Sequence, residues 1–135
     1  MIRVLVADHQ PIVSYGIRML FENSTDIRIV NTASSAKQLL DYLKKSNTDI
    51  VLMSIDLTDI NGITVLRTIK KEFRDVAVII FSTHPEDIYA ISAIKAGASG
   101  YLSKSVTNAT IKRAILKVYK GCLLYTSPSP RDTFE

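Results

Sequence analysis

The chain has 135 residues, a formal net charge of +4, and 47% hydrophobic against 22% charged residues, which is ordinary for one globular domain with its own core. Its basic residues are scattered in pairs such as Lys44–Lys45, Lys70–Lys71 and Lys112–Arg113, which we interpret as solvated helix surface rather than a nucleic-acid footprint. The single cysteine, Cys122, excludes an internal disulfide and a multi-cysteine zinc site.

The sequence shows neither a membrane span nor an export signal. Its longest apolar runs have the length of strands and are too short to cross a bilayer. The chain opens directly on the apolar run 2–7, without the charged and apolar regions of a secretory signal. We therefore expect a cytoplasmic protein that does not enter a membrane.

Five short apolar runs alternate with five helical patterns. The runs are rich in Val and Ile and predict strands at residues 2–7, 27–32, 50–53, 76–81 and 100–102. Most of these runs are apolar on both faces, as expected of central parallel strands. The run 27–32 alternates with polar residues, which indicates an edge strand.

Between the strands, apolar residues recur with the spacing of a helix. One such stripe consists of Ala36, Leu39, Leu40 and Leu43. On the predicted fourth helix, we expect Ile88, Ile91 and Ile94 to face the core. Residues typical of turns and caps separate the segments, namely Pro11, Asn61–Gly62, Gly97 and Gly121.

Strict alternation of strand and helix predicts an α/β fold, a parallel doubly wound sheet in three layers. Such sheets gather functional residues at the carboxyl ends of their strands. Polar residues follow four of the predicted strands: Asp8 and His9, Ser54, Ser82, and Lys104. We expect them to share one edge, where a carboxylate, hydroxyl groups and an ammonium together suit a phosphoryl group.

The composition changes after Gly121. Residues 122–132 have no helical or strand period, contain two prolines, and resemble the translation of a sequencing adapter. The alternative is a natural Ser/Pro linker. We therefore treat 122–135 as a non-native or disordered tail and leave it out of the expected fold.

Together, the strand ends resemble the receiver domains of two-component response regulators. The matching residues are 4–8 (Val-Leu-Val-Ala-Asp), 49–54 (Asp-Ile-Val-Leu-Met-Ser), Asn61–Gly62, 78–82 (Val-Ile-Ile-Phe-Ser) and 96–104 (Ala-Gly-Ala-Ser-Gly-Tyr-Leu-Ser-Lys). The last run, with Asp-x-x-Pro-Ile-Val at 8–13, is similar to the NarL/FixJ branch, which carries a LuxR-type helix-turn-helix after the receiver. The resemblance covers 1–121 and implies a flavodoxin-like (βα)₅ fold with strand order 2-1-3-4-5.

The resemblance also implies a role for each polar residue of the edge. Ser54 stands at the phosphoacceptor position, Lys104 matches the lysine that pairs with the phosphoryl group, and Asp8 matches the first member of the acidic pair. Ser82 matches the hydroxyl residue that turns toward phosphate, and Tyr101 the aromatic switch that follows it. Asp56 stands where a backbone carbonyl helps to hold magnesium, so Asp8 and Asp56 are the candidates for Mg²⁺, which the resemblance alone suggests.

Three departures fall on this chemistry. The family has an acceptor aspartate where this chain has Ser54, a second acidic residue where it has His9, and a Pro-Gly turn where it has Thr58–Asp59. A pocket with Asp8 and Lys104 as its charges is nearly neutral, and a serine hydroxyl needs a base before it attacks phosphorus. We therefore predict a pseudo-receiver, in which Asp8 and Lys104 form a direct ion pair.

Other interpretations stay open at this point. Asp56 is an alternative phosphoacceptor, and His9 is an alternative base for Ser54. An enzyme or small-ligand binder on the flavodoxin-like scaffold is a further alternative, but 8–11 (Asp-His-Gln-Pro) replaces the Gly-rich phosphate loop such proteins carry after their first strand. We expect a domain that is not an enzyme and has no resident cofactor.

Partners follow from the resemblance. It implies a histidine kinase and a homodimer of the full-length protein, formed through helices one, four and five with strand five. DNA contact is expected only through a C-terminal helix-turn-helix domain, which is absent from this chain.

Overall fold

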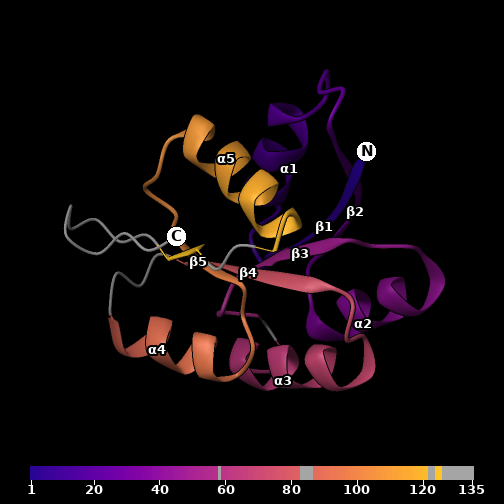
Figure 1. The fold of residues 1–135 in the computed structure, drawn as a ribbon. Coiled ribbons are helices and arrows are strands. Elements are labelled where there is room, and N and C mark those ends of the chain that lie inside the picture. Colours follow the sequence, from indigo (N-terminus) through magenta and orange to yellow (C-terminus); the bar gives the residue numbers. More distant parts are fainter. Residues whose placement is uncertain (58, 83–86, 122–123, 126–135) are drawn as a thin grey trace.

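In a computed structural model, residues 1–57, 59–82, 87–121 and 124–125 are described, although of 87–89 and 124–125 only the backbone is described. Strands and helices alternate along them (Figure 1). The elements are β1 (Ile2–Ala7), α1 (Pro11–Leu20), β2 (Ile27–Ala33), α2 (Ala36–Lys45), β3 (Ile50–Met53), α3 (Gly62–Glu72), β4 (Ala77–Ser82), α4 (Asp87–Lys95), β5 (Gly100–Ser103), α5 (Asn108–Tyr119) and β6 (Leu124–Tyr125). None of the described helices has the length and apolar character of a membrane span.

The strands form one parallel sheet in the order β2-β1-β3-β4-β5-β6. The predicted order 2-1-3-4-5 is confirmed, and so is the edge position of β2. The strand β1 lies between β2 and β3 because the chain reverses its direction of winding after β2, which places a topological switch point beside β1.

A sixth strand, β6, lies beyond β5, where we expected no regular structure. Leu124 pairs with Gly100, and Tyr125 pairs with Tyr101. The physical reason is that the outer edge of β5 offers unpaired backbone N–H and C=O groups, to which a short apolar segment can add.

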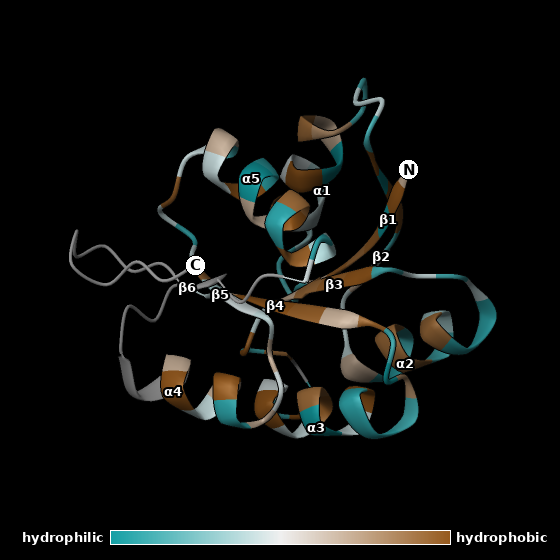
Figure 2. Ribbon diagram, in the orientation of Figure 1, coloured by the Kyte–Doolittle hydropathy of each residue, from teal (hydrophilic) through white to brown (hydrophobic). Residues whose placement is uncertain are grey.

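Two layers of helices cover the sheet. Figure 1 shows α1 and α5 on one face and α2, α3 and α4 on the other. Successive residues of β3 alternate between the two cores, since Ile50 and Leu52 belong to the α1/α5 side whereas Val51 and Met53 belong to the α2/α3/α4 side. All four are at most 1% exposed, and Figure 2 shows β3 and most of β4 in the brown shades of hydrophobic residues. The three-layer prediction is confirmed.

Side-chain and glycine caps end most of these helices. Pro11 is the first residue of α1, and Ser35, Asn61 and Thr107 each accept a hydrogen bond from a backbone N–H two or three residues further on. Gly97 and Gly121, after α4 and α5, have φ values of 109° and 94°, a left-handed conformation that glycine adopts without strain. The predicted cap positions are confirmed.

The prediction that Lys70 is part of a solvated helix surface needs correction. Its Nζ donates to the backbone oxygens of Val76 at 2.8 Å and Arg74 at 3.2 Å, so it holds the connection between α3 and β4 instead of pointing into solvent. A side chain at Gly97 would bring its Cβ to 2.8 Å from Lys70 Cγ. The lysine stem therefore occupies the space beside Gly97.

The expected core face of α4 is wrong for one residue. Ile91 is 55% exposed, whereas Ala90 and Ala93 are 2% and 0% exposed. Alanines let α4 lie close to the sheet, and this turns Ile91 outward. Ile94 packs against the core as expected, and the side chain of Ile88 lies outside the described residues.

Candidate functional site

The carboxyl ends of four neighbouring strands meet at one edge of the sheet. Ala7 pairs with Met53, Met53 with Ile80, and Ser82 with Ser103. The residues that follow these strands, or end them, therefore lie at a common level. The structure brings Asp8, Ser54, Ser82 and Lys104 together at this edge, and the first three are at most 2% exposed.

Asp8 is a buried carboxylate with a partner for each oxygen. Its Oδ2 lies 2.7 Å from Lys104 Nζ, and its Oδ1 accepts a hydrogen bond from Gln10 N at 2.8 Å. The second bond shapes the turn that leads into α1. Asp8 thus neutralises Lys104 and also fixes the turn after β1.

Lys104 is held from two sides. Its backbone N donates to the carbonyl oxygen of Ser82, the last residue of β4, at 2.8 Å, which continues the β4–β5 pairing one residue past the end of β5. Its ammonium lies 5.9 Å from the centroid of the Phe81 ring, within the range of a cation–π contact. The side chain of Lys104 is only 14% exposed, so its ammonium lies largely inside the fold.

The hydroxyl of Ser54 is engaged with the backbone. Ser54 N donates to the carbonyl oxygen of Ala7 at 2.9 Å, and Ser54 Oγ accepts from Asp56 N at 3.1 Å. The second contact is a turn closed by a serine hydroxyl at the start of the β3–α3 loop. Ser54 is therefore a buried, neutral group that shapes the loop.

His9 and Asp56 lie at the rim rather than inside the pocket. The side chain of His9 is 37% exposed, and its Nδ1 lies 3.7 Å from Asp8 Oδ1. Asp56 is exposed. Among the described residues no hydrogen bond joins His9 to Ser54, so the Ser–His pair considered from the sequence is not formed in this structure.

The two residues expected to act as a switch are both inside the fold. Ser82 is 1% exposed and Tyr101 is 2% exposed. They lie on the adjacent strands β4 and β5, near the end where Lys104 follows. Both side chains are therefore enclosed within the fold.

One contact at this edge was not predicted from the sequence, which indicated Asp59 only as part of a changed turn. Asp59, in the β3–α3 loop, accepts hydrogen bonds from Ala36 N at 2.8 Å and Lys37 N at 3.1 Å. These bonds, the one from Ala36 first, hold the pKa of the Asp59 carboxyl below its usual value. No local pattern signals the contact, because the partners lie more than 20 positions apart in the sequence.

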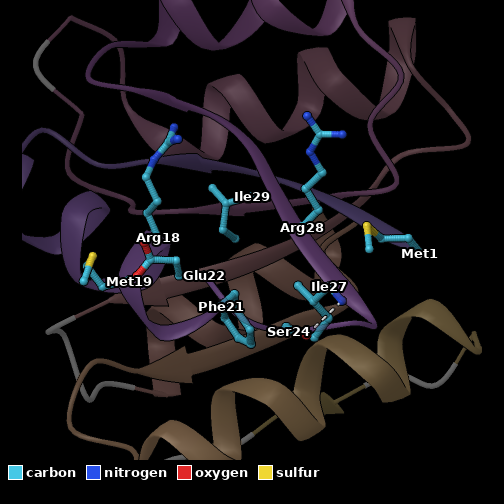
Figure 3. Close-up of a pocket in the computed structure, with 9 residues that line it drawn as sticks. All are labelled: Met1, Arg18, Met19, Phe21, Glu22, Ser24, Ile27, Arg28 and Ile29. Carbon is cyan, nitrogen blue, oxygen red and sulfur yellow. Dashed lines mark hydrogen bonds between the residues drawn. The ribbon is translucent and has the colours of Figure 1, made fainter.

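A separate hollow lies at the other end of the sheet, where the strands begin. It has a volume of about 430 Å³ and lies between the end of α1 and the start of β2, where Arg18 and Arg28 flank Ile29 (Figure 3). A hollow of about 370 Å³ reaches Asp8 instead. Because doubly wound sheets carry their chemistry at the carboxyl ends of the strands, the first hollow is not where this fold places a catalytic site.

Comparison with known proteins agrees with this geometry. The family model of the response regulator receiver domain matches residues 4–116. The chain is 33% identical over 121 residues to the response regulator UvrY of Escherichia coli K12, covering 90% of this chain and 56% of UvrY. It is 30% identical over 121 residues to the transcriptional regulatory protein LnrK of Bacillus subtilis, covering 90% and 55%. The chain thus spans little more than half the length of these curated relatives.

Solved structures give the same result. A LuxR-family two-component response regulator from Aurantimonas sp. SI85-9A1 superposes with a TM-score of 0.86 at 32% identity, covering 93% of this chain and 89% of the other. The isolated receiver domain of RcsB from Salmonella enterica superposes with the same TM-score at 20% identity, covering 93% of both chains, which is a likeness of fold alone.

Proposed function

This chain belongs to the response regulator receiver domain family, and we propose that it is a pseudo-receiver, a signalling domain that works without accepting a phosphoryl group. The observation that carries the proposal is the state of its pocket. The residue at the acceptor position is a buried serine whose hydroxyl accepts a hydrogen bond from the loop, and the neighbouring carboxylate is paired with Lys104.

The serine lacks the means to replace an aspartate as nucleophile. An aspartate is an anion at neutral pH, since its ordinary pKa is about 3.9, whereas a hydroxyl must lose its proton to a base during attack. Ser54 Oγ has a backbone N–H as its described partner, and His9 makes no described hydrogen bond to it. Ser54 is therefore not activated.

The residues of the pocket do not fit a magnesium ion. Mg²⁺ requires an octahedral set of oxygen ligands, usually with one or two free carboxylates. Here Asp8 uses one oxygen for Lys104 and the other for Gln10 N, and His9 stands where the second carboxylate would be. Over the described part of the chain, no three His, Cys, Asp or Glu side chains gather where they could hold a metal ion.

The ion pair also supports a fixed conformation. The resemblance to the family implies that Lys104 would bind an incoming phosphoryl group and that Ser82 would move toward it. With Lys104 held by Asp8 at 2.7 Å, and with Ser82 and Tyr101 enclosed, the switch lacks the anion that would move it. The domain would keep one arrangement of its surface.

That surface includes an apolar stripe suited to protein contacts. Along α1, Ile12, Tyr15 and Met19 are 77%, 63% and 46% exposed, at the spacing of one helix face. We propose that the domain acts through such contacts, in a cytoplasmic protein that forms a homodimer and regulates transcription through a C-terminal DNA-binding domain. LnrK is named a transcriptional regulatory protein, and RcsB has been solved as dimers bound to DNA. A histidine kinase would then bind this stripe without transferring phosphate.

Incubation with acetyl phosphate and magnesium, followed by intact-mass measurement, tests the proposal. We expect no added phosphoryl group on the wild-type chain. The double variant Ser54→Asp/His9→Asp restores the two missing carboxylates and is expected to gain one group. A gain on the wild type that is lost in Asp56→Asn would overturn the proposal in favour of Asp56 as acceptor, and a gain lost in Ser54→Ala would identify Ser54.

The enzyme or ligand-binding alternative needs a separate measurement. A thermal-shift screen with nucleotides and flavins distinguishes it from an interaction module. Stabilisation by either ligand class would favour the alternative, whereas concentration-dependent self-association would favour the module.

A further inference from the structure

The β3–α3 loop is attached to the N-terminus of α2 by one side chain. Asp59 Oδ1 accepts a hydrogen bond from Ala36 N at 2.8 Å, and Asp59 Oδ2 accepts one from Lys37 N at 3.1 Å. Each carboxylate oxygen thus takes one backbone N–H of the first helical turn. A negative charge at this end of a helix is also favoured by the helix dipole.

The helix needs this partner because its own sequence satisfies only part of its first turn. Ser35 Oγ accepts from Gln38 N at 3.2 Å, and the carbonyl oxygen of Ser35 accepts from Leu39 N at 3.1 Å. The N–H groups of Ala36 and Lys37 have no acceptor from these neighbours. Unpaired N–H groups at a helix start must find a partner outside the helix, and here that partner is a loop more than 20 residues further along the chain.

The other end of the loop is fixed as well. The carbonyl oxygen of Ile55 accepts from Gly62 N at 2.9 Å and from Leu57 N at 3.2 Å. A Cβ at Gly62 would lie 2.6 Å from Ile55 Cα, so the two backbone segments are in contact. The loop therefore closes on itself at its base and is joined to α2 at its tip.

We propose that Asp59 is a positioning residue that clamps the β3–α3 loop to α2 and so holds the loop that follows Ser54 in one conformation. The clamp depends on the carboxylate, whose two oxygens accept the two helix N–H groups. The proposal concerns the loop and not phosphoryl transfer, so it can fail or hold independently of the proposed function.

Amide hydrogen exchange by NMR on the full chain tests the clamp. In Asp59→Gly, we expect the amides of Ala36 and Lys37 to exchange about tenfold faster or more, and those of Leu57 and Gly62 to accelerate with them, because local opening of the loop exposes both. Asp59→Asn keeps one acceptor oxygen and should retain protection at one of the two helix amides.

Asp41→Asn is the matched control, since Asp41 is an exposed carboxylate on the same helix with no hydrogen bond or ion pair among the described residues. It removes the same charge and should leave all four amides unchanged. If Asp59→Gly accelerates the two α2 amides alone, Asp59 is a helix cap without control of the loop, and the proposal is wrong. Unchanged exchange at every site would show that the contact does not persist in solution. Asp59→Asn keeps the test interpretable if the glycine variant does not fold.

Discussion

Replacing Lys104 by methionine should lower the free energy of unfolding, because the buried carboxylate beside it would lose its cationic partner. Methionine keeps a long apolar stem against Phe81 but removes the ammonium 2.7 Å from Asp8 Oδ2. Asp8 is 2% exposed, so water does not readily replace the lost partner. Breaking a buried ion pair at one end typically costs about 3–5 kcal/mol. We expect about 3 kcal/mol, because Asp8 keeps its hydrogen bond from Gln10 N.

Removing the charge of Asp8 instead should lower the free energy of unfolding by a smaller amount. Asp8→Asn retains an acceptor for Gln10 N, and the Lys104 side chain, at 14% exposure, is close enough to the surface to turn its ammonium to water. We expect a loss of about 1–2 kcal/mol in the free energy of unfolding. Because the two side chains are in contact, the double variant should cost less than the sum of the two, with a coupling above about 1 kcal/mol.

Urea unfolding followed by circular dichroism at neutral pH measures all three variants, provided that the dependence on urea stays constant. Lys112→Met is the control, because Lys112 is an exposed lysine of α5, and its replacement should change stability by no more than about 0.5 kcal/mol. The reasoning is refuted if Lys104→Met costs no more than this control, or if the two single effects simply add.

Two further predictions concern close contacts elsewhere. Gly62→Ala should lower the free energy of unfolding by about 1–3 kcal/mol, because its Cβ would meet the Ile55 backbone at 2.6 Å. Gly16→Ala, on the open face of α1, should instead raise it by up to about 1 kcal/mol. Equal melting temperatures for the two variants would contradict this prediction. Burial works to raise the pKa of Asp49, but hydrogen bonds from Arg3 outweigh it and the net shift is downward. The stabilising effect of Asp49 is therefore present above the ordinary pKa of an aspartate and is lost as pH falls through the lowered value. Asp49→Asn should accordingly cost up to about 1 kcal/mol at neutral pH, and urea titrations should show the cost vanishing in acid.

The strands and their parallel sheet were predictable because they depend on patterns of few neighbouring residues, whereas the strand order came from the resemblance to receiver domains. Runs such as 50–53 are apolar on both faces, and this alone indicates a central parallel strand. The convergence of Asp8 and Lys104 followed from topology, since both come directly after parallel strands. Their ion pair followed from charge, because the other expected pocket carboxylates are missing from positions 9 and 54.

The features that were not predicted are contacts between segments distant in sequence, or results of side-chain packing. The Asp59 contact with α2 depends on how far one loop reaches across the edge of the sheet. The exposure of Ile91 depends on two alanines that face the sheet in its place. The engagement of Ser54 Oγ by Asp56 N is local, but the sequence alone does not distinguish it from a hydroxyl that faces an open pocket.

Lys70 and Gly97 have a consequence for how this domain can vary. The lysine stem fills the volume beside the glycine, while its amine donates to the carbonyl of Val76 in the connection between α3 and β4. A larger residue at 97 would meet the lysine stem and would also strain the left-handed backbone at that position, so a shorter residue at 70 would relieve only the first of these conflicts. The shorter residue would also leave the carbonyl of Val76 without this donor. Both positions should therefore be hard to change, alone or together.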